Sequence, residues 1–389
     1  MTAGLRQYCS VVSLRRYVRG RKVNCMKKRN VSIELLRILA MMMVILLHYL
    51  GKGNLLQGLT GNMPINGYIA WGMESLSAVA VNVYMLISGY FLVESGFKPA
   101  RLVELICQVL FYTILVPVVL GCIGVVSLKE FTIYDILLNI LPVQMNQYWF
   151  VTAYVIMYLF SPVLSAAAKA MKKEQLKYTI IGLLLFFAVS KTILPVALAI
   201  DNRGNDGVWF LCVFLVAAYI RLYGIPFFTE GSVKVLRTKG FLCYLLSSFG
   251  IFVLTFAVRA VYLKTGSLDH FIKIGFDYNH VLNLLGAIGL FYAFLHWKLP
   301  QEGVFARVVL KVAPYSFGVY LVHEQLQIRY LWPHWLGATL EGNAVFFVIR
   351  CVFSVALIYI LGTLADVVRA GVFWIIKRCM QRFLPNNKA

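Results

Sequence analysis

Ten stretches of roughly 20 apolar residues each limit what this 389-residue chain can fold into. An α-helix needs about 20 apolar residues to cross the hydrocarbon core of a lipid bilayer. Charged residues make up 14% of the chain, whereas soluble domains carry about 25%. The pattern predicts an all-α polytopic membrane protein with about ten transmembrane helices and excludes a soluble globular enzyme. The expected spans are residues 33–51, 68–93, 102–126, 147–166, 178–200, 208–228, 241–262, 278–299, 312–333 and 343–365.

The net charge of +21 is explained by the loops between these spans. A basic chain often binds nucleic acid, but here too little polar sequence remains to build a basic face, so no nucleic-acid partner is expected. With ten spans, 27 of the 37 Lys and Arg residues fall on the side of the termini and six on the other side. Because positive charge favours the cytoplasmic side, we expect both termini in the cytoplasm and a multi-pass protein of the plasma or inner membrane.

The chain divides into one membrane domain and two basic ends. Residues 1–29 read as a basic N-terminal leader, either disordered or an over-extended start with Met26 as the alternative first residue. Residues 30–366 form the expected membrane domain, and residues 367–389 a basic cytoplasmic tail. No internal repeat is visible, and residues 133–143 are apolar but too short to cross a bilayer.

Arg37 and His48 are the first candidates for chemistry, because ionisable residues inside a span are costly and usually functional. Eleven residues separate them, almost three helical turns, so both point from one face about 16 Å apart along the axis. An imidazole suits general-base or nucleophilic work near neutral pH. The structural alternative is an Arg37–Glu34 ion pair together with a hydrogen-bonded core histidine, and the spacing alone does not decide between the two.

Two further carboxylates lie in predicted spans. Glu74 enters the second span at a depth similar to His48, where it could orient the imidazole as the acid of a triad does. Pairing with Arg259 or Arg350 is an equally good structural role for it. His323 and Glu324, expected near mid-membrane within residues 312–333, form the second functional candidate.

Several common motifs are missing from the sequence. It contains no C-x-x-C pair, no phosphate-binding P-loop and no Rossmann glycine pattern. HEQLQ at 323–327 lacks the second histidine of a zinc protease, and no histidine carries the H-x4-D pattern of glycerolipid acyltransferases. Metal, nucleotide hydrolysis and redox cofactors are therefore unsupported, and no metal is expected.

Four segments in order resemble the acyltransferase family 3 membrane proteins, multi-span enzymes that acylate carbohydrates of cell surfaces. Each motif alone is weak, but their order and spacing agree from Met26 to about residue 366. The segments are R-x10-H at 37–48, V-N-V-Y-M-L-I-S-G-Y-F at 81–91, Y-W-F-x3-Y-x3-Y-x3-P at 148–162 and S-F-G-V-Y-L-V-H at 316–323.

The resemblance implies transfer of an acyl group, usually acetyl, from cytoplasmic acyl-CoA to a hydroxyl of an extracytoplasmic or lipid-linked glycan. His48 would deprotonate the acceptor or briefly carry the acyl group. The expected site comprises catalytic His48, Glu74 and His323, the CoA-binding cations Arg37, Lys98 and Arg101, and the substrate-binding residues Tyr148, Trp149 and Glu324. Acetyl-CoA would be the co-substrate, and the glycan and the lipid bilayer would be the partners.

Two other functions stay open at this point. A transporter or flippase for a lipid-linked sugar or acylated intermediate would also have ten spans with interior charges and prolines. A membrane anchor without chemistry would leave the interior His and Glu residues unexplained.

Many members of the family carry a C-terminal esterase-like domain, and about two dozen residues follow the last span here. We therefore expect either a stand-alone transferase or one that works with a separate extracytoplasmic transferase.

Overall fold

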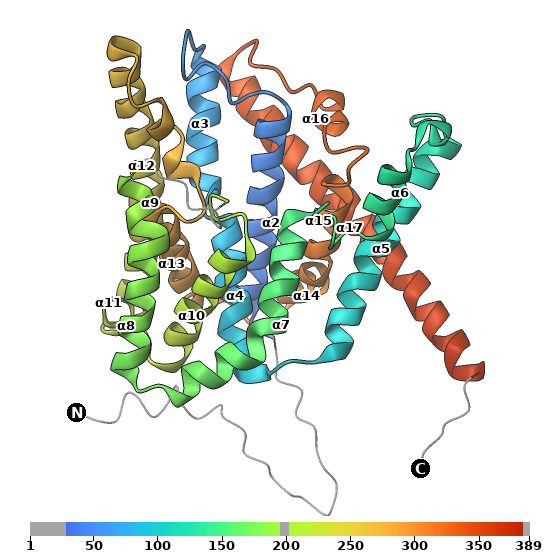
Figure 1. Cartoon of the computed structure of the whole chain (residues 1–389), viewed down its shortest axis with the longest axis horizontal. Coiled ribbons are helices and arrows are strands. Elements are labelled where there is room, and N and C mark those ends of the chain that lie inside the picture. The colour runs from blue at the N-terminus through green and yellow to red at the C-terminus, as the bar shows by residue number, and fades with distance from the viewer. Residues whose placement is uncertain (1–28, 195–201, 384–389) are drawn as a thin grey trace, which may run out of the picture. The chain divides into compact units, whose positions relative to one another are not determined.

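The computed structural model describes residues 29–194 and 202–383, and every regular element among them is helical (Figure 1). This confirms the predicted all-α class. The predicted leader, with Met26, lies outside the described residues apart from Arg29, as does the end of the predicted tail after Phe383.

Among the described residues, nine helical stretches are long and apolar enough to cross a membrane. The apolar helix α10, Gly207–Leu222, has 16 residues and corresponds to the sixth expected span, residues 208–228. Five of the nine stretches lie within a single helix: Val31–Lys52 (α2), Pro99–Cys122 (α5), Trp149–Ala170 (α7), Val233–Thr265 (α12) and Ala344–Gln381 (within α17, Ala344–Phe383). Three combine successive helices: Ile65–Ser95 (α3 Ile65–Ser77, α4 Ala80–Ser95), Lys173–Ile193 (α8 Lys173–Leu184, the π-helical turn Leu185–Val189, α9 Ser190–Ile193) and Val304–His323 (α14 Val304–Val312, α15 Ser316–His323). The last, Asp269–Leu295, ends in α13 Val281–Leu295. The remaining α-helices are α6 Ile133–Ile140, α11 Pro226–Thr229 and α16 Leu331–Trp335.

Helix α2 is the central element around which the candidate site is built. It contacts α3, α4, α13, α14, α15 and α17, and Figure 1 shows it among them. Its apolar sequence has Glu34 in the first turn and Lys52 in the last. These charges complement the helix dipole at each end. Because these six helices surround α2, polar side chains in its last turns are enclosed by protein rather than by lipid.

The second expected span, residues 68–93, is not one continuous helix. Helix α3 ends at Ser77 and α4 begins at Ala80. The carbonyl of Leu76, freed by the break, accepts a hydrogen bond of 2.8 Å from the hydroxyl of Tyr244 on α12. Backbone groups at membrane depth need such partners because lipid offers none.

The ninth expected span, residues 312–333, differs from the structure, in which the corresponding apolar stretch is Val304–His323. Helix α15 ends at His323, so His323 lies at a helix end rather than in the middle of a span. The side-chain oxygen of Gln325 accepts from the backbone N–H of Gln327 at 2.8 Å and closes a turn there. The indole of Trp332 donates to the His323 carbonyl at 3.0 Å, which satisfies one of the last free carbonyls of the helix.

Close packing on α17 fixes the position of α15. A Cβ atom added to Gly362 would lie 3.0 Å from the Cα of Val319, and one added to Gly318 would collide with the Asp366 side chain. Glycine at these two positions lets the helix backbones approach closely, as small residues do in membrane proteins.

Asp366 itself is fully buried and saturated with hydrogen bonds. Its carboxylate accepts from the Tyr112 hydroxyl at 2.7 Å, the Arg369 guanidinium at 2.7 Å and the Gln108 amide at 3.1 Å. These contacts tie α17 to α5. Helix α17 runs unbroken through Phe383, so no helix end marks the expected boundary at residue 366.

Candidate functional site

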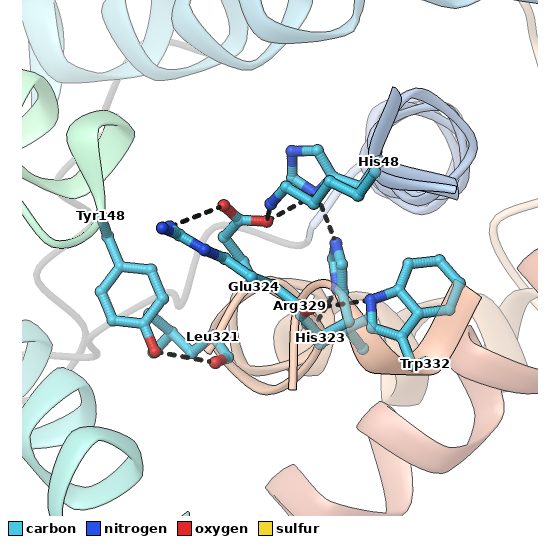
Figure 2. Close-up of polar contacts among 9 residues, drawn as sticks. His48, Tyr148, Leu321, His323, Glu324, Arg329 and Trp332 are labelled. Atoms are coloured by element: carbon cyan, nitrogen blue, oxygen red, sulfur yellow. Dashed lines mark hydrogen bonds and ion pairs between the residues drawn. The ribbon is translucent and has the colours of Figure 1, made fainter. Parts of the chain in front are cut away.

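Two histidines from opposite ends of the sequence meet at the end of α15. The Nδ1 atom of His48 lies 3.0 Å from the Nε2 atom of His323, and the Nδ1 atom of His323 lies 2.6 Å from the Val319 carbonyl (Figure 2). A carbonyl only accepts, so Nδ1 of His323 carries a proton. In neutral His323 the Nε2 atom is then an acceptor, and Nδ1–H of His48 donates to it.

Glu324 is the carboxylate that faces His48. Its Oε2 atom lies 3.2 Å from Nδ1 of His48 and pairs with the ammonium group of Lys52, while its Oε1 atom lies 3.7 Å from Arg329. Figure 2 shows these groups converging from α2 and from the segment after α15. Two cations therefore surround one carboxylate beside the imidazole.

These contacts leave the other ring nitrogen of His48 available. Within the described part of the chain, the structure gives Nε2 of His48 no hydrogen-bond partner, and the side chain remains 20% exposed. A neutral imidazole whose Nδ1–H is held by an acceptor presents an unprotonated Nε2. This is the arrangement of a general base oriented by a second group.

The predicted residues Tyr148 and Trp149 lie beside this cluster. The Tyr148 hydroxyl donates to the Leu321 carbonyl at 3.0 Å, as Figure 2 shows, and its ring lies 5.8 Å from that of Tyr320. Trp149 stacks on Tyr278, with ring centroids 5.5 Å apart. The aromatic segment at the start of α7 thus forms one wall of the site.

Glu74 has different surroundings from those expected. Its Oε2 atom is buried without a hydrogen-bond partner among the described residues, and Lys273 is the cation that acts on it. The described structure gives no hydrogen bond between Glu74 and His48, whereas Glu324 lies against the imidazole. A catalytic role for Glu74 stays a prediction.

The structural role considered for Glu74 is not found either. Arg259 donates to the carbonyls of Gly58 and Gly61, and Arg350 donates to the carbonyl of Thr339. Both guanidinium groups anchor loop backbone. Neither forms an ion pair with Glu74 among the described residues.

The three predicted CoA-binding cations lie away from the two histidines. Arg37 makes a loose ion pair of 3.5 Å with Glu34, as the structural alternative expected, yet its side chain stays 32% exposed. Lys98 and Arg101 are exposed. Arg37 and Arg101 both act electrostatically on the Tyr154 hydroxyl, which indicates that they face the same part of α7.

A row of aromatic rings connects these cations with the two histidines. Phe150, Tyr154 and Tyr158 follow one another at four-residue spacing, so they share one face of α7 over about 12 Å. The backbone of Lys98 is hydrogen bonded to the Tyr158 hydroxyl at one end of the row. The successive ring-centroid distances are 6.2 Å for Tyr158–Tyr154, 6.2 Å for Tyr154–Phe150, 5.7 Å for Phe150–Tyr320 and 6.3 Å for Tyr320–His48.

Comparison with protein families decides the class of protein. Residues 30–363 match the acyltransferase 3 model, described as an acyltransferase domain. The chain belongs to acyltransferase family 3. It is therefore a membrane acyltransferase, and the family favours the enzyme over the transporter considered above. No curated protein and no solved structure shows significant similarity to it.

Several residues of this acyltransferase site were not singled out from the sequence. Lys52 follows His48 by four residues, a spacing that places both on one helix face. Tyr320 precedes His323 by three residues within the fourth motif, so the same rule applies to it. Arg329 comes from the turn after α15 and has no such local signal. Within the described residues, no group of three His, Cys, Asp or Glu side chains could hold a metal ion.

Asn82 of the second motif acts as a support for this site. Its side chain is fully buried and donates to the Tyr278 carbonyl at 2.7 Å and to Asn283 at 3.1 Å, while it accepts from the Trp209 indole at 2.9 Å. These bonds hold the backbone of Tyr278, whose ring packs on Trp149. The motif therefore contributes a positioning residue rather than a reacting group.

Proposed function

We propose that this membrane acyltransferase moves an acyl group, most simply acetyl, from acyl-CoA to a hydroxyl group of a carbohydrate. The observation that carries the proposal is the state of His48. Its Nδ1–H is held by His323 and Glu324, and its Nε2 has no partner among the described residues. Family membership supplies the reaction class, and the free imidazole nitrogen supports a hydroxyl as the group to be activated.

The reaction needs one proton acceptor that later becomes a proton donor. Nε2 of His48 takes the proton of the acceptor hydroxyl while the oxygen attacks the thioester carbonyl carbon. The new C–O bond forms, the C–S bond breaks, and the CoA thiolate leaves with the proton from His48. Glu324 stabilises the imidazolium that exists between these steps. In the second route, Nε2 itself attacks the thioester carbonyl carbon, the C–S bond breaks and the CoA thiolate leaves. The acceptor hydroxyl then attacks the acyl-histidine, the C–N bond breaks, and the hydroxyl proton neutralises the thiolate.

The donor would enter from the end that carries Arg37, Lys98 and Arg101. Exposed guanidinium and ammonium groups form charge-assisted hydrogen bonds with phosphates. The distribution of basic loops supports a cytoplasmic position for this end, where CoA thioesters are made. The aromatic row on α7 leads from there to His48, and its apolar faces suit the arm of the cofactor.

The acceptor would approach from the end that carries Lys52 and Arg329. Aromatic faces such as those of Trp149 and Tyr278 suit the apolar face of a sugar ring, and Glu74 offers an unpaired carboxylate oxygen to its hydroxyls. A surface or lipid-linked glycan in the cell membrane fits this arrangement. A separate extracytoplasmic transferase would serve as the next acyl acceptor where the glycan lies beyond reach.

The test uses the full chain in proteoliposomes with labelled acetyl-CoA and an added oligosaccharide. We expect free CoA thiol to appear together with label on the sugar in equal amounts. Sugar that crosses the bilayer without label would support a transporter and contradict the proposal. Label on lipid or protein without label on any carbohydrate would reject the acceptor class.

A further inference from the structure

Tyr320 carries a buried hydroxyl group that the structure leaves without a partner. The residue is 5% exposed, and its phenolic oxygen has no hydrogen bond among the described residues. Three tyrosines nearby differ in this respect, because Tyr84, Tyr148 and Tyr158 each donate to a backbone carbonyl. A buried hydroxyl without a partner costs free energy in the unliganded protein. Such a group points to an acceptor atom supplied by a ligand.

The location of Tyr320 identifies the part of the ligand concerned. Its ring centroid lies 6.3 Å from that of His48 and 6.1 Å from that of His323. On the other side, Phe150 at 5.7 Å joins it to the aromatic row that leads to the cationic end. Tyr320 therefore stands where an acyl group that travels along this row would reach His48.

We propose that the Tyr320 hydroxyl is a catalytic hydrogen-bond donor to the carbonyl oxygen of the thioester. The inference rests on the acyl transfer proposed above. When the acceptor oxygen bonds to the carbonyl carbon, the C=O electron pair moves onto the carbonyl oxygen, and the Tyr320 O–H stabilises this negative charge. The C=O bond then re-forms as the C–S bond breaks. Tyr320 keeps its proton throughout, and the thiolate takes its proton from His48.

The surroundings of Tyr320 are compatible with this role. The nearby carboxylate Glu324 pairs with Lys52 and lies 3.7 Å from Arg329, so two cations offset its negative charge beside the site. A fixed donor in a site shielded from water stabilises the transition state more than the ground state, because the charge develops only during the reaction.

The test is Tyr320→Phe, which removes only the hydroxyl oxygen. We expect kcat to fall by about 10²- to 10³-fold, while the KM for acetyl-CoA stays within about twofold because the ground-state carbonyl carries little charge. The thermal unfolding midpoint should not fall, since the oxygen has no partner to lose. The matched control is Tyr359→Phe. Tyr359 is also buried, but its hydroxyl pairs with Ser316 of α15 at 3.1 Å, and its loss should leave kcat within about twofold.

Two CoA analogues separate catalysis from packing. A trifluoromethyl ketone analogue forms a tetrahedral adduct and mimics the charged intermediate, whereas a thioether analogue has no carbonyl. Tyr320→Phe should weaken inhibition by the ketone about 10²-fold and leave that by the thioether unchanged. Equal weakening of both, or a kcat within about threefold of the parent, would overturn the inference. If Tyr320→Phe is active and His48→Ala is not, only this inference fails, whereas activity in both would reject the proposed function.

Discussion

Nδ1 of His48 lies 3.0 Å from Nε2 of His323, although 275 residues separate them in the sequence. The contact joins the first motif of the chain to the fourth. It fixes which nitrogen of His48 carries the proton, because His323 in turn donates to the Val319 carbonyl. The Nε2 atom is thereby left for chemistry. The arrangement requires α15 to stop at His323, so helix termination is part of the site.

Glu324 should act through His48 rather than on the substrate. In Glu324→Gln the neutral amide no longer stabilises the imidazolium, so we expect kcat to fall on the order of 10²-fold or more. The KM for acyl-CoA should change by less than about threefold. Steady-state kinetics in proteoliposomes provide the measurement. Glu341→Gln, in an exposed turn, is the control, and a loss confined to KM for the acceptor would show that Glu324 binds substrate instead.

Lys98 and Arg101 should bind the donor phosphates without affecting the chemical step. Removal of one charge-assisted contact costs about 1.5–3 kcal/mol, so Lys98→Ala or Arg101→Ala should raise the KM for acetyl-CoA by about tenfold or more at unchanged kcat. The KM for acetyl-pantetheine, which lacks the nucleotide phosphates, should be the same in the parent and the variants. Lys264→Ala removes an exposed lysine in the last turn of α12 and should be neutral. An unchanged KM for acetyl-CoA in both Lys98→Ala and Arg101→Ala would show that the donor phosphates bind elsewhere.

Gly318 should be needed for the position of α15. In Gly318→Ala the added methyl group would overlap the Asp366 side chain, and such overpacking costs about 1–3 kcal/mol. The thermal unfolding midpoint and the activity should both fall, because α15 carries Tyr320 and His323. Gly371→Ala on α17 is the matched control, since its added methyl group meets no atom within 4 Å. A Gly318→Ala variant with full stability and activity would show that α15 does not depend on this contact.

Local patterns in the sequence predicted the helices and the first part of the site. Hydropathy indicated the spans, and the eleven-residue spacing placed Arg37 and His48 on one face of α2, which the single helix Val31–Lys52 supports. The partner of His48 could not be found this way. Glu74 and Glu324 both lie within expected spans, and only the tertiary packing places Glu324 against the imidazole.

The end of α15 shows the physical limit of such patterns. Residues 312–333 are apolar enough to suggest one span, but Gln325 and Gln327 form a side-chain-closed turn that ends the helix at His323. A hydropathy average over about 20 residues does not detect so short a polar segment. Lys52 likewise falls just outside the first expected span, residues 33–51, whereas the folded chain pairs it with Glu324.

The role of His48 as the catalytic base is tested most directly by measuring acetyl transfer by His48→Ala in proteoliposomes. The rate of label transfer from acetyl-CoA to carbohydrate should fall by about 10²- to 10⁴-fold, the contribution expected of a positioned general base. His270→Ala, at an exposed histidine in the 3-10 helix Asp269–Phe271, should retain the parent rate. A His48→Ala protein that is inserted and folded as the parent and still transfers acetyl at the parent rate would show that His48 is not the catalytic base.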